Sequence, residues 1–143
     1  MSQQRLFPSD ADTIPALTIC QPWAWAILRG HKTVENRTWA TRYTGPLVIH
    51  AGASKAWLRD GEAFLQRHGF FVRREWLIFG ALLGVVELVD CGPVSQHAGN
   101  PWAFGPICWE LAKPRPLAKP VPYKGQLGIF RVPRSLVAAC LAA

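Results

Sequence analysis

Residues 16–39 read ALTICQPWAWAILRGHKTVENRTW, and the order of elements within this stretch constrains the rest of the fold. Its apolar start is typical of a short strand, and the apolar residues that follow recur at helical spacing. Pro22 suits a first helical position because its missing N–H would have no partner there, and Gly30 is a typical helix stop. We therefore predict a strand from Ala16 and a helix over residues 22–29.

The remaining pattern predicts several short strands and two more helices. Extended segments are expected at residues 32–39, 45–52, 79–92, 107–117 and 126–133, and helices at residues 54–69 and 134–143. A loop is expected over residues 93–105, and a proline-rich connection over residues 113–125. Twelve glycines and twelve prolines spread along the chain suit short strands with tight turns. We predict a mainly β, α+β fold in which helices pack on a small barrel.

The length and charge of the chain indicate one domain with an acidic partner. A chain of 143 residues is long enough for one domain and too short for two. We predict a flexible lead-in over residues 1–15 and a single domain over residues 16–143. The chain holds 16 Lys and Arg and 9 Asp and Glu, and residues 1–12 contribute one of the former and two of the latter. The remaining 15 basic and 7 acidic side chains give the folded part a charge of +8, which favours nucleic acid as a partner.

Several classes of protein are disfavoured by what the sequence lacks. No apolar run approaches the roughly 20 residues of a membrane span, and the first residues match neither a secretory nor a transit pattern. A cytoplasmic location without a membrane partner is the expectation. The four cysteines are far apart, which favours buried thiols over disulfides or a zinc site. Because no H-x-H or H-E-x-x-H spacing occurs, we predict neither a metal nor another cofactor.

The densest polar cluster, GHKTVENRTW, follows the first predicted helix at residues 30–39. In an extended chain, Thr33, Glu35 and Arg37 share one face, and Lys32 and Asn36 lie on the other. One interpretation is an exposed ion pair between Glu35 and Arg37, worth about 0–1 kcal/mol. The other is a nucleotide site that combines phosphate donors, base-edge partners and stacking surfaces. The residue types alone leave both open.

The same stretch also carries a family resemblance. LTICQPWAWAILRGHKTVENRTW, followed by GPLVIHAGASKA at residues 45–56, resembles the ASCH domain family, the activating-signal-cointegrator homology domains of the PUA-like superfamily. The shared features are a Q-P-aromatic-A helix, a G-x-K-T-x-E-x-R run and a G-P strand that ends in I-H-A. NPWAFGPICWEL and YKGQLGIFRVP, later in the chain, are also similar, so the resemblance covers about residues 16 to 134. It implies a PUA-like β-barrel with a cleft beside the first helix that receives RNA or a nucleotide.

The resemblance also implies which residues line that cleft. The expected ligand-binding residues are Gln21, Trp23, Lys32, Thr33, Glu35 and Arg37. Lys32 would hold a phosphate or act as an activating cation, and Glu35 would accept a hydrogen bond from a base or act as a general base. Arg37 would orient that carboxylate or contact phosphate. A structural hydrogen bond that braces the barrel is the alternative for each residue.

Binding of RNA or of a modified nucleotide in this cleft is the leading prediction. A second hypothesis is a hydrolase in the same cleft, with Lys32 and Glu35 as the catalytic residues. Relatives that hydrolyse acetylcytidine have a nucleophilic Thr three residues after the lysine, where this chain has Glu35. A ribonuclease would need a base and a cation, for which the available groups are His50, Lys55, Tyr43 and Lys32.

Basic residues near aromatic ones predict a further nucleic-acid surface. The side chains assigned to it are Lys55, Arg73, Arg74 and Lys124, because positive charge follows phosphates and aromatic rings stack on bases. A third hypothesis is a protein-interaction module without catalysis. The sequence does not indicate the oligomeric state.

Overall fold

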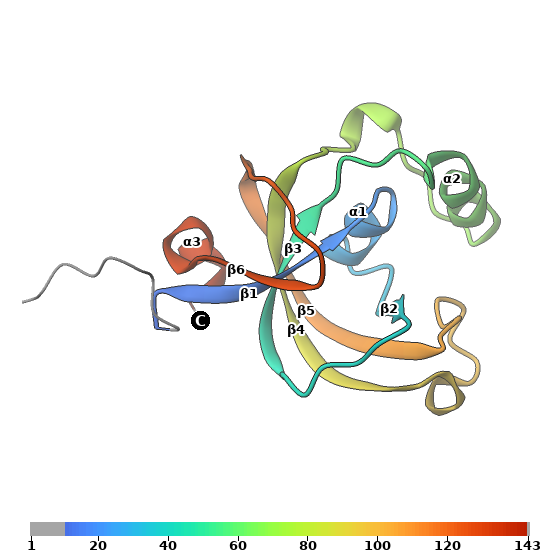
Figure 1. Ribbon diagram of the computed structural model, residues 1–143. Coiled ribbons are helices and arrows are strands. Elements are labelled where there is room, and N and C mark those ends of the chain that lie inside the picture. The colour runs from blue at the N-terminus through green and yellow to red at the C-terminus, as the bar shows by residue number, and fades with distance from the viewer. Residues whose placement is uncertain (1–10, 143) are drawn as a thin grey trace, which may run out of the picture.

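The computed structural model describes residues 11–142, and its six strands form one sheet in the order β2-β5-β4-β3-β1-β6 (Figure 1). The strands are β1 (Thr13–Ile19), β2 (Val34–Arg37), β3 (Gly45–Ala51), β4 (Ala81–Pro93), β5 (Ile107–Pro122) and β6 (Ile129–Pro133). The α-helices are α1 (Trp23–Leu28), α2 (Leu58–Arg67) and α3 (Ala138–Leu141). Three short 3-10 helices are η1 (Arg74–Trp76), η2 (Val94–His97) and η3 (Arg134–Val137).

The predicted α+β, mainly β fold is confirmed, but the described sheet is open and does not close into the predicted barrel. β2 pairs only with β5 and β6 pairs only with β1, which leaves these two strands as the edges. β1 and β3 are parallel, and every other pair is antiparallel. Irregular registers between β3 and β4 and between β4 and β5 bend the strands, and Figure 1 shows the sheet curving around α1. The curvature brings α1 inside the bend without joining the edge strands β2 and β6.

The core lies on both faces of the sheet. On the inner face α1 packs against β1, β3, β4 and β5, and all its residues from Ala24 to Leu28 are buried. Such a short helix is buried all round because α2 covers its other side, where Leu58 and Leu65 of α2 pack in one cluster with Trp25 of α1. On the outer face α3 packs over Ile14, Val48, Val85 and other residues of the sheet. The core therefore places α1 between the sheet and α2.

The predicted helices at residues 22–29 and 54–69 are confirmed as α1 and α2. A flexible lead-in is predicted over residues 1–15, but β1 begins at Thr13, so residues 13–15 belong to a strand. Residues 1–10 of the predicted lead-in lie outside the described residues. The C-terminal helix divides into η3 and α3.

The proline-rich connection is the larger correction, because β5 continues through it to Pro122. β2 pairs with β5 only from Ile107 to Glu110, so within residues 11–142 the later part of β5 has a strand partner only on the β4 side. Proline is tolerated in a strand that needs ladder hydrogen bonds on one side only. The prolines of this segment therefore do not end the strand.

Two further expectations concern the membrane and the cysteines. None of the helices within residues 11–142 has the length and apolar character to cross a membrane. All four cysteines are free thiols; Cys108 and Cys140 are buried, and Cys20 and Cys91 are half-buried.

Gly84 in the middle of β4 offers a test of the tight contact between α1 and the sheet. A Cβ atom there would overlap the backbone carbonyl oxygen of Arg115 and the side chain of Leu28. Gly84→Ala should lower the free energy of unfolding by about 1–3 kcal/mol, measured by denaturant titration. Gly92→Ala in the same strand is the control, because its Cβ would meet no backbone atom and only the movable ends of the Gln96 and Asp90 side chains. Equal losses for both variants would contradict this packing.

Candidate functional site

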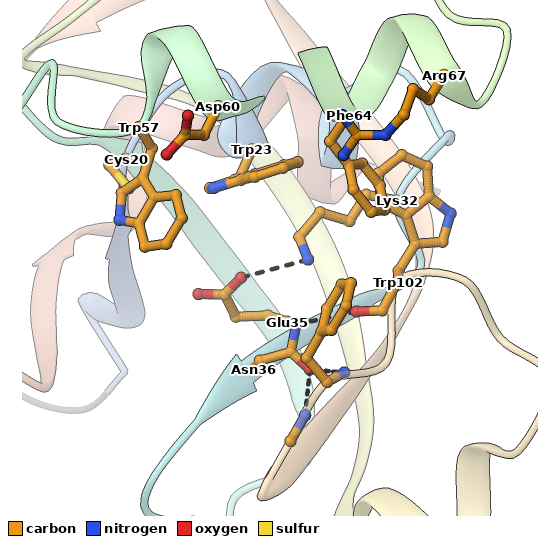
Figure 2. A pocket seen from close by; sticks show the side chains of 12 residues that line it. Cys20, Trp23, Lys32, Glu35, Asn36, Trp57, Asp60, Phe64, Arg67 and Trp102 are labelled. Carbon is orange, nitrogen blue, oxygen red and sulfur yellow. Dashed lines mark hydrogen bonds and ion pairs between the residues drawn. The ribbon is translucent and has the colours of Figure 1, made fainter. Parts of the chain in front are cut away.

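A pocket of about 550 Å³ opens between α1, α2, β2 and the loop that precedes β5 (Figure 2). Its lining is mostly aromatic and charged: Cys20, Trp23, Lys32, Glu35, Asn36, Trp57, Asp60, Phe64, Arg67, Trp102, Phe104 and Gly105. Three of the predicted ligand-binding residues, Trp23, Lys32 and Glu35, are among them. A volume of this size is in the range of small-molecule sites.

Lys32 is the buried cation of the pocket, with a side chain that is only 5% exposed. Its Nζ lies 3.8 Å from Oε1 of Glu35, 5.5 Å from the centre of the Trp23 ring and 5.9 Å from the centre of the Trp102 ring. Burial lowers the pKa of Lys32, and the nearby Glu35 carboxylate opposes that shift. Two aromatic rings and one carboxylate therefore stabilise the Lys32 ammonium, while its burial destabilises the same charged form.

Glu35 receives contacts from both sides of the polar cluster. Arg37 donates from Nε to Oε2 of Glu35 at 3.1 Å, and its NH2 group donates to the backbone oxygen of Thr18 at 2.6 Å. This confirms that Glu35 and Arg37 share a face of β2. Lys32 was predicted on the opposite face, but it precedes β2, so strand alternation does not direct its side chain. The structure thus joins all three residues in one charged cluster.

Asn36 fixes the loop that forms one wall of the pocket. Its Oδ1 accepts hydrogen bonds from the backbone N–H groups of Phe104 at 2.8 Å and Gly105 at 2.9 Å, and its Nδ2 donates to the backbone oxygen of Trp102 at 2.9 Å. Figure 2 shows this amide turned toward the loop. The Asn36 amide therefore positions two aromatic residues of the loop, Trp102 and Phe104.

The helix α2 supplies residues that the sequence did not assign to the site. Phe64 packs edge-on against Trp23, with ring centres 5.7 Å apart, and lies 5.3 Å from Trp102. Trp57, just before the helix, is 51% exposed and faces the pocket. The amphipathic pattern of residues 54–69 predicted a helix. That pattern carried no signal that the helix would lie opposite residues 32–37 across a pocket.

Two predicted ligand-binding residues lie elsewhere. Gln21 is 1% exposed and is not among the residues of the pocket. Its Oε1 accepts from the backbone N–H of Trp25 at 2.8 Å, and its Nε2 donates to the backbone oxygen of Ile78 at 2.9 Å. Thr33 is exposed, and its hydroxyl accepts a hydrogen bond from Nδ2 of Asn100 at 3.2 Å. Both side chains have structural partners.

The predicted nucleic-acid surface is divided between separate places. Arg73 and Arg74 lie at η1 and form ion pairs, with Glu75 at 3.6 Å and with Glu62 at 2.7 Å. Lys55 lies over the Phe79 ring, 5.6 Å from its centre, and Lys124 lies in the connection between β5 and β6. None of the four lines the pocket.

The chemistry available in this pocket is that of two cations, Lys32 and Arg67, two carboxylates, Glu35 and Asp60, and several aromatic faces. Among residues 11–142, no three His, Cys, Asp or Glu side chains are grouped so that they could hold a metal ion. The arrangement suits a flat, polar ligand that stacks on rings and exchanges hydrogen bonds with a carboxylate.

The fold and the site together define an α+β domain with an open, bent sheet and an aromatic pocket beside its first helix. A family model described as the ASCH domain matches residues 17–121. The chain belongs to the ASCH domain family.

Two relatives carry the name activating signal cointegrator 1. The human protein is 31% identical over 146 aligned positions, and the mouse protein is 29% identical over the same length. Each alignment covers 91% of this chain but only 24% of the relative, so the chain corresponds to about a quarter of those proteins.

Solved structures agree with the fold. "Crystal structure of ASCH from Zymomonas mobilis" superposes with a TM-score of 0.55 at 13% identity, over 85% of this chain and 88% of that one. A point mutant of the ZmASCH protein from the same organism gives 0.54 at 14% identity, over 82% of this chain and 88% of that one. These similarities concern the fold alone.

The role of Asn36 can be tested by stability. Asn36→Ala should lower the free energy of unfolding by about 2 kcal/mol, because it leaves two backbone donors of the loop without their acceptor. Thr33→Ala removes one exposed hydrogen bond to the same loop and should change stability by less than about 0.5 kcal/mol. Denaturant titration measures both, and a neutral Asn36→Ala would contradict the assigned role.

Proposed function

We propose that the pocket beside α1 is the ligand cleft of this domain and that it binds an unpaired nucleotide of RNA, either standard or modified. The observation that carries the proposal is the buried Lys32 beside Glu35 within an open, aromatic-lined pocket. A buried ion pair that only braced a core would be enclosed by packed apolar side chains.

The aromatic lining supports a base as the ligand. Unpaired RNA bases are commonly recognised by stacking on aromatic side chains, with hydrogen bonds to the base edges. Trp23, Trp57 and Trp102 offer faces or edges around a volume of about 550 Å³. Trp57 and Phe104 are 51% and 66% exposed, and a stacked base would cover apolar surface that now meets solvent.

The charges in the pocket support a nucleotide over a neutral ring. Glu35 keeps acceptor capacity for an amino or imino group of a base, because a carboxylate has about four lone-pair sites and Arg37 takes one of them. Arg67 at the rim can meet a phosphate. The positive charge of the whole domain would draw in a polyanion.

Two half-exposed tryptophans give a matched test of stacking in the pocket. Trp57 lines the pocket, whereas Trp76 is 43% exposed and stacks on Trp25 outside it. Trp57→Ala should weaken binding of single-stranded RNA by about 5- to 150-fold, because base stacking on one ring contributes about 1–3 kcal/mol. Trp76→Ala should leave affinity unchanged. Fluorescence anisotropy with labelled oligonucleotides measures both, and equal effects would place the binding site elsewhere.

One observation favours hydrolysis in the same pocket as a second candidate function. The lowered pKa of Lys32 enlarges the fraction of neutral amine, which can take a proton from an attacking water. For acetylcytidine, that water would add to the acetyl carbonyl, and the C–N bond would break as the protonated lysine returns the proton to the departing amine nitrogen, which yields cytidine and acetate. Glu35, 3.8 Å from the amine, would stabilise the lysine once it is protonated.

The hydrolase candidate predicts a base-catalysed pH profile. Product formation from acetylcytidine should rise with pH up to the lowered pKa of Lys32, because only the neutral amine can act as the base. Lys32→Met should abolish it, and Lys119→Met, an exposed position on β5, should not. Chromatographic detection of cytidine measures the rate. Product that persists in Lys32→Met, or no product from the native protein, would end this candidate.

A further inference from the structure

We infer that the ligand of this domain is a single RNA strand of several nucleotides, which runs from the pocket through two adjoining hollows to Lys124. The inference rests on the proposed function and names the form of its ligand: a strand and not an isolated nucleotide. It is carried by three cavities that share walls and by cations placed along them.

The pocket continues into a second hollow of about 380 Å³. Four residues line both cavities: Cys20, Trp23, Glu35 and Asn36. The second hollow adds Arg37 and reaches the connection between β3 and α2 at Gly52 and Ala53. Glu35 therefore stands at the junction, and a ligand seated against it in the pocket can extend past Arg37.

A third hollow of about 500 Å³ follows from there. It shares Thr18, Gly52 and Ala53 with the second and ends at the connection between β5 and β6, where Lys124 and Leu127 line it. The Leu127 side chain is 99% exposed. A base can pack on the exposed Leu127 side chain, and the phosphate of the same nucleotide can pair with the neighbouring Lys124.

The walls of the second and third hollows are held by a buried histidine. Nε2 of His50 lies 2.6 Å from the backbone oxygen of Tyr123, and its Nδ1 lies 3.0 Å from Oγ1 of Thr18. Because the carbonyl oxygen can only accept, Nε2 donates to it, and Nδ1 forms a hydrogen bond with the Thr18 hydroxyl. His50 is 2% exposed, and these two hydrogen bonds join β3, on which it lies, to β1 and to the loop after β5. The path is therefore preformed.

The charges along the path suit a polyanion. Among the described residues that line the three cavities, the cations are Lys32, Arg67, Arg37 and Lys124, and the carboxylates are Glu35 and Asp60. Arg67 and Lys124 belong to cavities at opposite ends, and Arg37 belongs to the middle one. A single nucleotide could meet one of these groups, whereas a strand can place a phosphate near each.

Length dependence tests the inference directly. The ligands are homopolymeric RNA oligonucleotides of one to about eight nucleotides, because small single-strand binding sites contact about that many nucleotides. Affinity, measured by calorimetry at several salt concentrations, should rise about tenfold or more with length before it levels off. Lys124→Ala should reduce the salt slope of the longer oligonucleotides by about 0.7, the value of one phosphate contact, and leave the shortest ones unchanged.

Two more variants make the test specific to this path. Lys119→Ala removes an equal charge from β5 at a residue that lines none of the three cavities, and it should leave length dependence as in the native protein. Ala53→Glu places a carboxylate at the exposed junction of the second and third hollows, and it should weaken only the longer oligonucleotides.

The outcomes separate this inference from the proposed function. If a single nucleotide binds as tightly as the longest oligonucleotide, and Trp57→Ala still abolishes binding, the strand path is overturned but the nucleotide pocket stands. Affinity that rises with length equally in the native protein, Lys124→Ala and Ala53→Glu would overturn the path as well. Binding that ignores Trp57 at every length would remove the pocket itself.

Discussion

The arrangement of this site depends on one constraint: the Lys32 ammonium is almost completely buried and needs partners where water is scarce. Glu35 supplies the opposite charge at 3.8 Å, and Arg37 balances the second oxygen of that carboxylate. The rings of Trp23 and Trp102 offer negative faces to the same cation. Trp102 can do so because Asn36 on β2 fixes the loop that carries it. The carboxylate and the two aromatic rings around Lys32 thus meet the needs of one buried cation, and Asn36 holds the loop that brings the second ring.

The bent, open sheet is what brings these residues to one place. β2 lies at the edge next to β5, and the loop before β5 lies beside it through the Asn36 hydrogen bonds. α1 fills the bend and presents Trp23, and α2 covers α1 and presents Phe64. A closed barrel would have paired the outer edge of β2 with another strand. Because that edge has no strand partner in the described sheet, the surface around β2 is free to form a pocket and its continuation toward Lys124.

The sequence predicted the local elements well and the long-range contacts poorly. Helical spacing and the flanking Pro22 and Gly30 located α1, and strand alternation placed Glu35 and Arg37 on one face of β2. The contact of Lys32 with Glu35 was missed because Lys32 precedes the strand. The wall built by Phe64 and Trp102 joins segments far apart in the chain, and no local pattern encodes such an approach. Gln21 was expected at the ligand for its position in a motif, but its amide is used by backbone groups of α1 and of the segment before β4.

We propose that RNA binds in the pocket around Lys32 and Glu35, and the seven tryptophans of the chain allow this to be measured directly. Indole N–H resonances in a two-dimensional NMR spectrum can be assigned by single substitutions and followed while a single-stranded RNA is added. The account predicts that the resonances of Trp23, Trp57 and Trp102 shift in proportion to binding while those of Trp76 and the fully buried Trp109 stay in place. Shifts centred on Trp76, with the three pocket tryptophans unmoved, would contradict it.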